Sequence, residues 1–250
     1  MAESDAKTPR ERYRVQVRTE IKQHAWEQIA TAGTSALSLN AIAKRMGMSG
    51  PALYRYFAGR DDLITALVRE AYRSLADTVR EVSAASAPPA PSVASMPSGT
   101  PANSGPGGAA PVKSEPPVPG ADTVVALAYA LRGWALDDPH RYFLVYGTPI
   151  PGYHAPDDIT AIASEIMEAL LDACASLPSA GSPAPFATHL EGHREWAHGH
   201  PAPSAALHRA LTLWTRLHGA LSLELAGHFT GMGFDPAQYF EAELRDLLAP

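Results

Sequence analysis

Apolar residues recur every three or four positions through most of this 250-residue chain, and this spacing constrains its fold more than any other feature. Side chains three and four residues apart lie on one face of an α-helix. No stretch shows the alternating, β-branched pattern that is typical of strands. The most regular run, spaced 4-3-4-3-4, comprises Leu207, Leu211, Trp214, His218, Leu221 and Leu225. The sequence therefore predicts an all-α protein.

Capping residues set the bounds of the expected helices. Gly33 and Gly47 follow apolar-periodic stretches, where glycine commonly ends a helix. Ser38 and Asp138 are typical N-cap residues, and Pro139 suits the first helical position after Asp138. We expect helices over residues 12–32, 38–46, 49–58, 61–82, 122–136, 159–173, 207–225 and 236–248, and a further helix that starts at residue 139.

Residues 83–120 interrupt this helical pattern. Of these 38 residues, ten are Pro, eight Ala, seven Ser and five Gly, and none is aromatic. Such a segment buries too little apolar surface to offset its chain entropy. We predict a flexible basic arm at 1–17, a helical unit at 18–62, a connecting helix at 63–82, a disordered insertion at 83–120 and a second helical domain at 121–250. A second Pro/Gly/Ser-rich stretch, 176–203, is expected to be a loop.

Charge is unevenly distributed along the chain. The whole chain carries a formal net charge of -6. Residues 7–60 hold ten Lys and Arg against three acidic residues, whereas residues 83–250 hold seven against sixteen. A basic segment in an acidic protein favours a polyanionic partner for that segment. Arg10, Arg12, Arg14 and Arg18 either seek phosphates or form a basic tail that contacts nothing specific.

Other classes of protein are disfavoured by what the chain lacks. Cys174 is the only cysteine, which excludes an intrachain disulfide and a cysteine-cluster metal site. No apolar run is long enough for a membrane span, and the first residues have no signal-peptide core. We therefore expect a cytoplasmic protein that has no membrane partner.

Two short helices joined by Gly47-Met48-Ser49 form a helix-turn-helix candidate. The segment from Ser38 to Phe57 contains basic residues and no acidic residue. An α-helix fits the major groove of DNA, where its N-terminal residues reach base edges and flanking hydroxyl and basic groups bind phosphates. The sequence therefore predicts a DNA-reading unit.

Residues 18–68 resemble the DNA-binding domain of the tetracycline-repressor (TetR) family. The order and spacing of one set of residues carry the resemblance: Gly33, Leu37-Ser38-Leu39, Ile42-Ala43, Met46-Gly47-Met48-Ser49, Leu53-Tyr54-Arg55-Tyr56-Phe57 and Arg60-Asp61-Asp62-Leu63. The resemblance implies an all-helical homodimer, with an N-terminal three-helix helix-turn-helix domain and a C-terminal helical domain for ligand binding and dimerisation.

The resemblance also implies which residues face DNA. The recognition helix would present Gly50, Pro51, Ala52 and Tyr54, and Tyr56 and Arg60 would contact phosphates where the family more often has His and Lys. The alternatives are that Tyr54 packs under its helix and that Lys44 and Arg55 are solvated surface charges. The expected DNA-binding residues are Ser38, Asn40, Lys44, Ser49, Gly50, Pro51, Ala52, Tyr54, Arg55, Tyr56 and Arg60.

Beyond residue 120 the resemblance is to a C-terminal subclass of these regulators with a Trp-His-Gly signature, here Trp214, His218 and Gly219. It implies a pocket for a small, mostly apolar effector. The expected lining is Trp134, Tyr142, Phe143, Tyr146, Met167, Trp214 and His218. For each of these residues taken alone, plain core is the favoured alternative. The expected dimer interface uses Leu207, Leu211, Leu221, Leu225, Tyr239, Leu244 and Leu247.

No cofactor, metal or catalytic role is expected. The segment HLEGHREWAHGH (His189, His193, His198, His200) lacks the HExxH order of a zinc site, so a surface loop is favoured. Neither a nucleophile elbow nor a phosphate-binding glycine loop is present. The sequence therefore predicts a ligand-responsive regulator, most simply a repressor released from a palindromic operator. The alternative is an activator or a partner-binding protein of the same fold with no effector.

Overall fold

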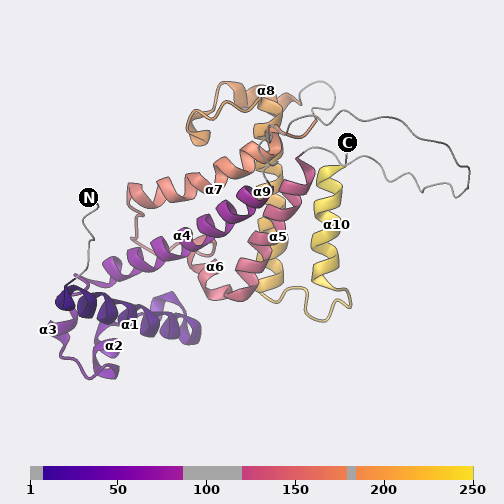
Figure 1. Ribbon diagram of the computed structural model, residues 1–250. Helices are drawn as coiled ribbons and strands as arrows, with labels where there is room; N and C mark the ends of the chain where they lie inside the picture. Colours follow the sequence, from indigo (N-terminus) through magenta and orange to yellow (C-terminus); the bar gives the residue numbers. More distant parts are fainter. Residues whose placement is uncertain (1–7, 87–119, 179–183, 250) are drawn as a thin grey trace, which may run out of the picture.

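The computed structural model describes residues 8–86, 120–178 and 184–249, and every regular element within these ranges is a helix. Figure 1 shows three N-terminal helices at one end of the molecule, with a long helix leading from them into a C-terminal bundle. The all-α prediction is confirmed.

The N-terminal unit consists of α1 (Pro9–Ala32), the short 3-10 helix η1 (Thr34–Ala36), α2 (Leu39–Arg45) and α3 (Gly50–Leu53). Helix α1 ends at Gly33, which has a positive φ of 77°, as its sequence position predicted. The unit has a core of fully buried side chains, with Ile21, Ile42 and Phe57 each 0% exposed. This core fixes the three helices relative to one another.

Helix α1 begins earlier than the sequence analysis expected. The Thr8 hydroxyl accepts from the Glu11 backbone N–H at 3.3 Å, and the Glu11 carboxylate accepts from the Thr8 N–H at 2.7 Å. This capping box, with Pro9 at the first position, stabilises a helical start. The prediction of a flexible arm over 1–17 is therefore wrong for 9–17, and the remainder, 1–7, lies outside the described residues.

Helix α4 (Arg60–Ser86) joins the two parts of the molecule without a break. Its 27 residues span about 40 Å, and its buried side chains belong to both cores. The expected boundary between 62 and 63 therefore lies within one helix. Of the expected insertion at 83–120, residues 83–86 end α4 and 120 caps the next helix, and 87–119 lie outside the described residues.

The C-terminal domain is built around α4 by α5 (Ala121–Asp137), α6 (Pro139–Tyr146), α7 (Asp157–Ala175) and α9 (Ser204–Leu225). Helix α10 (Pro236–Leu248) lies against α9 and α5 and contributes the buried Phe240. The expected loop at 176–203 contains a short helix, α8 (Pro185–Glu191), and a 3-10 turn, η2 (Glu195–Ala197), because Ala187 and Leu190 are buried.

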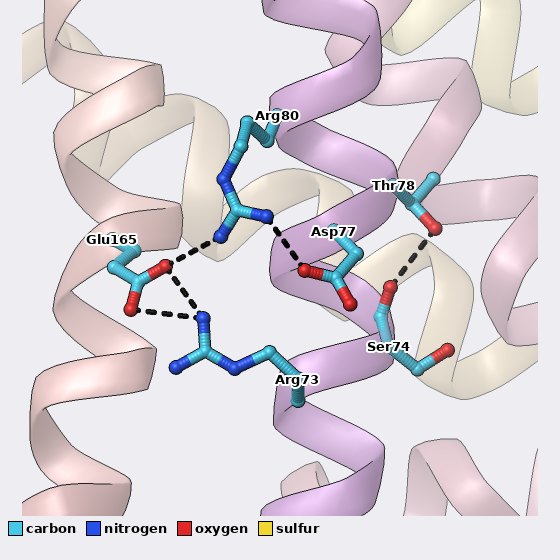
Figure 2. Close-up of polar contacts among 6 residues, drawn as sticks. All are labelled: Arg73, Ser74, Asp77, Thr78, Arg80 and Glu165. Atoms are coloured by element: carbon cyan, nitrogen blue, oxygen red, sulfur yellow. Dashed lines mark hydrogen bonds and ion pairs between the residues drawn. The ribbon is translucent and has the colours of Figure 1, made fainter. Parts of the chain in front are cut away.

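Ion pairs join α4 to α7 along their exposed edge. Figure 2 shows Arg73 and Arg80 of α4 pointing toward Glu165 of α7, where both bind its carboxylate at 2.9 Å. Arg80 also pairs with Asp77 on its own helix at 2.7 Å. These contacts hold the connecting helix to the bundle at its solvent side.

Candidate nucleic-acid interface and internal cavity

The turn between α2 and α3 presents α3 on the surface. The Ser38 hydroxyl caps α2 by accepting from the Ala41 N–H at 3.3 Å, and Gly47 takes the positive φ of 66° that the turn requires. Ser49 occupies the N-cap position of α3, but its side chain makes no capping hydrogen bond. The turn therefore forms as its residues predicted, with the Ser49 side chain exposed.

The expected DNA-binding residues lie on α2 and α3, in the turns that flank these two helices, and at the start of α4. Tyr54 is 49% exposed, whereas Leu53 and Phe57 are 0% exposed and fill the core beneath it. The alternative in which Tyr54 packs under its helix is thus not what the structure shows. The exposed members of the set are Asn40, Lys44, Ser49, Pro51, Tyr54 and Arg55, and the half-buried members are Ser38, Gly50, Ala52, Tyr56 and Arg60.

Gly50 leaves open space at the start of α3. A Cβ at this position would meet only the Asn40 side-chain oxygen, at 3.6 Å, which is ordinary van der Waals contact. Asn40 and Gly50, ten positions apart in the sequence, therefore lie side by side at the point where α3 begins.

Two arginines of this unit make structural contacts. Arg60 Nη2 donates to the Thr34 carbonyl at 2.8 Å, so part of its guanidinium docks α4 against η1. Arg18 donates to the Tyr56 carbonyl, and its guanidinium lies 4.1 Å from the centre of the Phe57 ring. Sequence reasoning grouped Arg18 with the arm and missed this contact, because nothing local in the sequence pairs residues 18 and 57.

Aromatic side chains from α6 and α9 form one cluster in the C-terminal domain. Tyr142 is 0% exposed, and its hydroxyl lies 3.0 Å from His218 Nδ1 and 2.8 Å from Ser222 Oγ. The Tyr146 ring packs against His218 and Trp214, with ring centres 4.4 and 5.8 Å apart. Tyr142, Tyr146, Trp214 and His218 are therefore connected through contacts between neighbouring rings.

The other three expected pocket residues have different surroundings. Trp134 is 4% exposed, and its Nε1 donates to Ser74 Oγ at 3.2 Å beneath the Arg141 guanidinium. Phe143 lies at the edge of the cluster, 5.5 Å from the Tyr142 ring centre. Met167 packs on the C-terminal core from α7. The structure therefore assigns Trp134 to the contact between α5 and α4.

Burial keeps the cluster uncharged. Desolvation lowers the pKa of His218 to about 4, so its imidazole is neutral at pH 7. Desolvation also raises the pKa of Tyr146 well above 10 and raises that of Tyr142, against a smaller lowering from the hydrogen bond to Ser222.

A cavity of about 40 Å³ lies beside this cluster, between α4, α5, α7 and α9. Trp214 is the one expected pocket residue that lines it. The rest of the lining is aliphatic: Leu75, Val79, Val124, Leu127, Ala128, Leu131, Ile166, Leu170 and Leu217. Pockets that hold drug-sized ligands enclose about 300–1,000 Å³, so the cavity must enlarge to admit one.

A larger groove lies on the surface between α1, α4 and α7. It encloses about 660 Å³ and is lined by charged side chains, among them Arg69 and Asp158, which pair at 2.6 Å. The pairing lowers the pKa of Asp158. An open groove of paired charges suits an apolar effector less well than the internal cavity does.

Burial within this chain changes the expected dimer interface. Leu207 and Leu221 are 0% exposed and Leu244 is 3% exposed, so these three already pack in the core of their own chain. The buried stripe of α9 includes Leu207 and Leu221 of the regular seam and continues through Ala210, Leu213, Leu217 and Ala220. Leu211, Leu225 and Leu247 are half-buried, and Tyr239 is 39% exposed. These four keep surface that a second chain can cover.

The histidine-rich segment is held by contacts within the chain. His193 Nδ1 lies 2.9 Å from the His189 carbonyl, and His200 Nε2 lies 3.1 Å from the Asp172 carboxylate. In the described ranges, no three His, Cys, Asp or Glu side chains are grouped to hold a metal ion. Nor does any helix in these ranges have the length and apolar character needed to cross a membrane.

Comparisons with known proteins agree with this geometry. Residues 21–67 match the family described as bacterial regulatory proteins, tetR family, and 124–247 match the tetracyclin repressor-like C-terminal domain. The HTH-type transcriptional regulator Rv1816 of Mycobacterium tuberculosis is 34% identical over 246 residues, covering 94% of this chain and 92% of that protein. The regulator Mb1846 of Mycobacterium bovis is similar to the same extent.

Solved structures show the same likeness. The regulatory protein SCO4313 is 60% identical to this chain, with a TM-score of 0.77 over 97% of this chain and 100% of that one. A TetR/AcrR-family regulator from Thermobifida fusca has a TM-score of 0.53 at 18% identity, over 93% of this chain and 97% of that one. The second likeness shows the fold alone.

Proposed function

Since the chain belongs to the TetR family of DNA-binding transcriptional regulators, and is therefore not an enzyme, we propose that it is a ligand-responsive repressor. As a homodimer in the cytoplasm it binds a palindromic operator, and a small-molecule effector releases it. The observation that carries this proposal is the outward presentation of α3 over a closed apolar core, with exposed polar and basic groups around it and an apolar cavity on the same connecting helix.

The DNA face combines groups that suit base and phosphate contacts. Tyr54 and Asn40 are exposed beside the open position at Gly50, where the backbone can approach base edges closely. Lys44 and Arg55 are also exposed, and their charges suit phosphates. Arg60 already donates to a carbonyl, so any phosphate contact from it uses its remaining N–H groups.

Dimerisation places two such faces on one operator. The exposed surfaces of α9 and α10 include Leu223, which is 45% exposed, and Tyr239, which is 39% exposed. Pairing these helices with those of a second copy gives an isologous four-helix interface. Two recognition helices would then reach successive major grooves about 34–36 Å apart.

Effector release follows from the way that α4 and α6 join both cores. Leu75 and Val79 of α4 line the cavity, and the first turns of the same helix pack in the core of the DNA-binding unit. Helix α6 places Tyr142 in the aromatic cluster and Leu144 in the core of the DNA-binding unit. An effector that enlarges the cavity by displacing α4 also moves a helix of the DNA-binding unit. It shifts the equilibrium only by binding the displaced state more tightly.

The test begins with selection of genomic DNA fragments that the purified protein binds. The double variant Lys44→Ala with Tyr54→Ala should bind the selected operator at least tenfold more weakly. The matched control is Phe186→Ala on α8, because Phe186 is 49% exposed, as is Tyr54, and lies in the C-terminal domain. Equal binding by the double variant and the parent would refute the DNA face.

Two further readouts separate the alternatives. A monomer in light scattering at micromolar concentration would remove the dimer from the proposal. A reporter gene behind the selected operator should be repressed by the protein, and increased expression would favour the activator.

A further inference from the structure

Two buried polar atoms in the aromatic cluster have no partner among the described residues. They are the Tyr146 hydroxyl, at the end of α6, and His218 Nε2, on α9. Buried polar groups are almost always hydrogen-bonded, so two orphans in adjacent rings indicate a site for a missing partner. Their ring centres lie only 4.4 Å apart.

The hydrogen bonds at Nδ1, on the other side of the imidazole, determine whether Nε2 is a hydrogen-bond donor or an acceptor. Ser222 Oγ, the Tyr142 hydroxyl and His218 Nδ1 form a chain with steps of 2.8 and 3.0 Å. The Tyr142 hydroxyl also lies 3.3 Å from the His218 carbonyl, which can only accept, and it has a single proton to donate. We assign that proton to the shorter contact with Nδ1, so the neutral ring carries its own proton on Nε2, which then donates. The Tyr146 hydroxyl can donate as well. Together they match one oxygen atom with two lone pairs.

The cavity beside these atoms has an apolar lining that contains no charged side chain. Trp214 joins the two features, since it lines the aliphatic cavity and packs on both Tyr146 and His218. Two half-buried arginines lie near the cluster, and neither lines the cavity. Arg141 donates to Ser74 Oγ and to the Trp134 carbonyl, and Arg132 pairs with Glu224 at 2.5 Å. A charged ligand in the cavity would therefore be desolvated with no charged side chain lining its site.

We propose that the effector is an uncharged, mainly apolar molecule with one carbonyl or hydroxyl oxygen. That oxygen hydrogen-bonds to the Tyr146 hydroxyl and His218 Nε2, and the apolar part fills the enlarged cavity beside Trp214. This inference rests on the proposed effector-responsive function and specifies the chemistry of its ligand. It gives Tyr146 a recognition role and Tyr142 a positioning role through Nδ1.

The test uses a matched seven-carbon series on the full chain at pH 7.5: 2-heptanone, 1-heptanol, heptanoate and heptylamine. Binding is followed by tryptophan fluorescence and by the shift in melting temperature. We expect 2-heptanone and 1-heptanol to bind at least tenfold more tightly than heptanoate or heptylamine. Heptanoate or heptylamine binding as tightly as 2-heptanone would overturn the proposed ligand class, and so would binding of none of the four.

Tyr146→Phe tests the recognition atom. It removes an oxygen that has no partner, so the variant should fold and keep the parent's melting temperature or exceed it. It should bind 2-heptanone about fivefold more weakly. The matched control is Tyr72→Phe, because the Tyr72 ring packs edge-on against Tyr146, with the ring centres 6.0 Å apart. This control should bind 2-heptanone as tightly as the parent does. Equal loss in both variants would overturn the assignment.

Operator binding is measured separately, with no probe present. Failure of the parent to bind any selected DNA would refute the proposed function while leaving the probe result interpretable. Normal operator binding with no preference for the uncharged oxygen probes would refute this inference alone.

Discussion

Leu144→Ala should weaken the DNA-binding unit from the C-terminal side of the molecule. Leu144 lies on α6, is 7% exposed, and packs in the core that also contains Ile21 and Phe57. In the sequence, α4 and α5 both lie between Leu144 and these two residues. The substitution therefore removes support that the N-terminal sequence does not itself supply.

The expected cost follows from the carbon atoms removed. Three buried carbons at about 0.8 kcal/mol each give about 2.4 kcal/mol, and the residual cavity adds to this figure. Because 7% of the side chain is exposed, partial collapse limits the cavity, and we expect a total of about 2.5–3.5 kcal/mol. At about 2–4 °C per kcal/mol, the melting temperature should fall by about 5–14 °C.

The assay combines urea unfolding with amide hydrogen exchange. Leu127→Ala is the matched control, since Leu127 is 6% exposed on α5 and belongs to the other core. Both variants should lose similar free energy of unfolding, but only Leu144→Ala should lose exchange protection first in α1 to α3. A loss below about 1 kcal/mol, or equal protection of α1 to α3 in both variants, would refute the reasoning.

Three other changes have defined outcomes. Gly147→Ala should destabilise the protein by more than 1 kcal/mol in urea unfolding, because its Cβ would overlap the Phe143 backbone carbonyl; unchanged stability would contradict this. The pKa of His218 is about 4 in the folded chain against 6.5 ordinarily, so the unfolded state binds the proton first and stability falls as pH drops from 6.5 to 4. The slope of the free energy of unfolding against pH should approach about 1.4 kcal/mol per pH unit in the parent and be smaller in His218→Asn. Equal slopes in the parent and the variant would count against the burial of this ring. Burial raises the pKa of Cys174 to about 12, so iodoacetamide should modify it only in urea, and rapid native labelling would oppose this.

Local signals in the sequence were sufficient for most of the fold. Ser38 and Asp138 cap helices as predicted, through hydrogen bonds to the third residue of each helix. Gly33 and Gly47, which were predicted to end helices, both adopt a positive φ. These features depend on neighbouring residues alone, and residues 236–248 form a helix with the predicted bounds.

Features that depend on distant contacts were harder to predict. The seam of α9 looked equally suitable for a partner chain or for its own core, and only the packing places Leu207 and Leu221 inside. Trp134 was predicted to be a pocket residue. Its hydrogen bond to Ser74 joins residues 60 positions apart, and no local pattern in the sequence indicates such a contact. The capping box at Thr8 and Glu11 was a local signal that the sequence analysis missed.

The open position at Gly50 makes the proposed DNA face adjustable. Its φ is not positive, and an added Cβ would touch only the Asn40 side chain, at 3.6 Å. Side chains can therefore be introduced there without disturbing the core that Leu53 and Phe57 fill. A library of variants at residue 50, screened against shifted operators, would let operator preference be redesigned while the folding of the regulator stays constant.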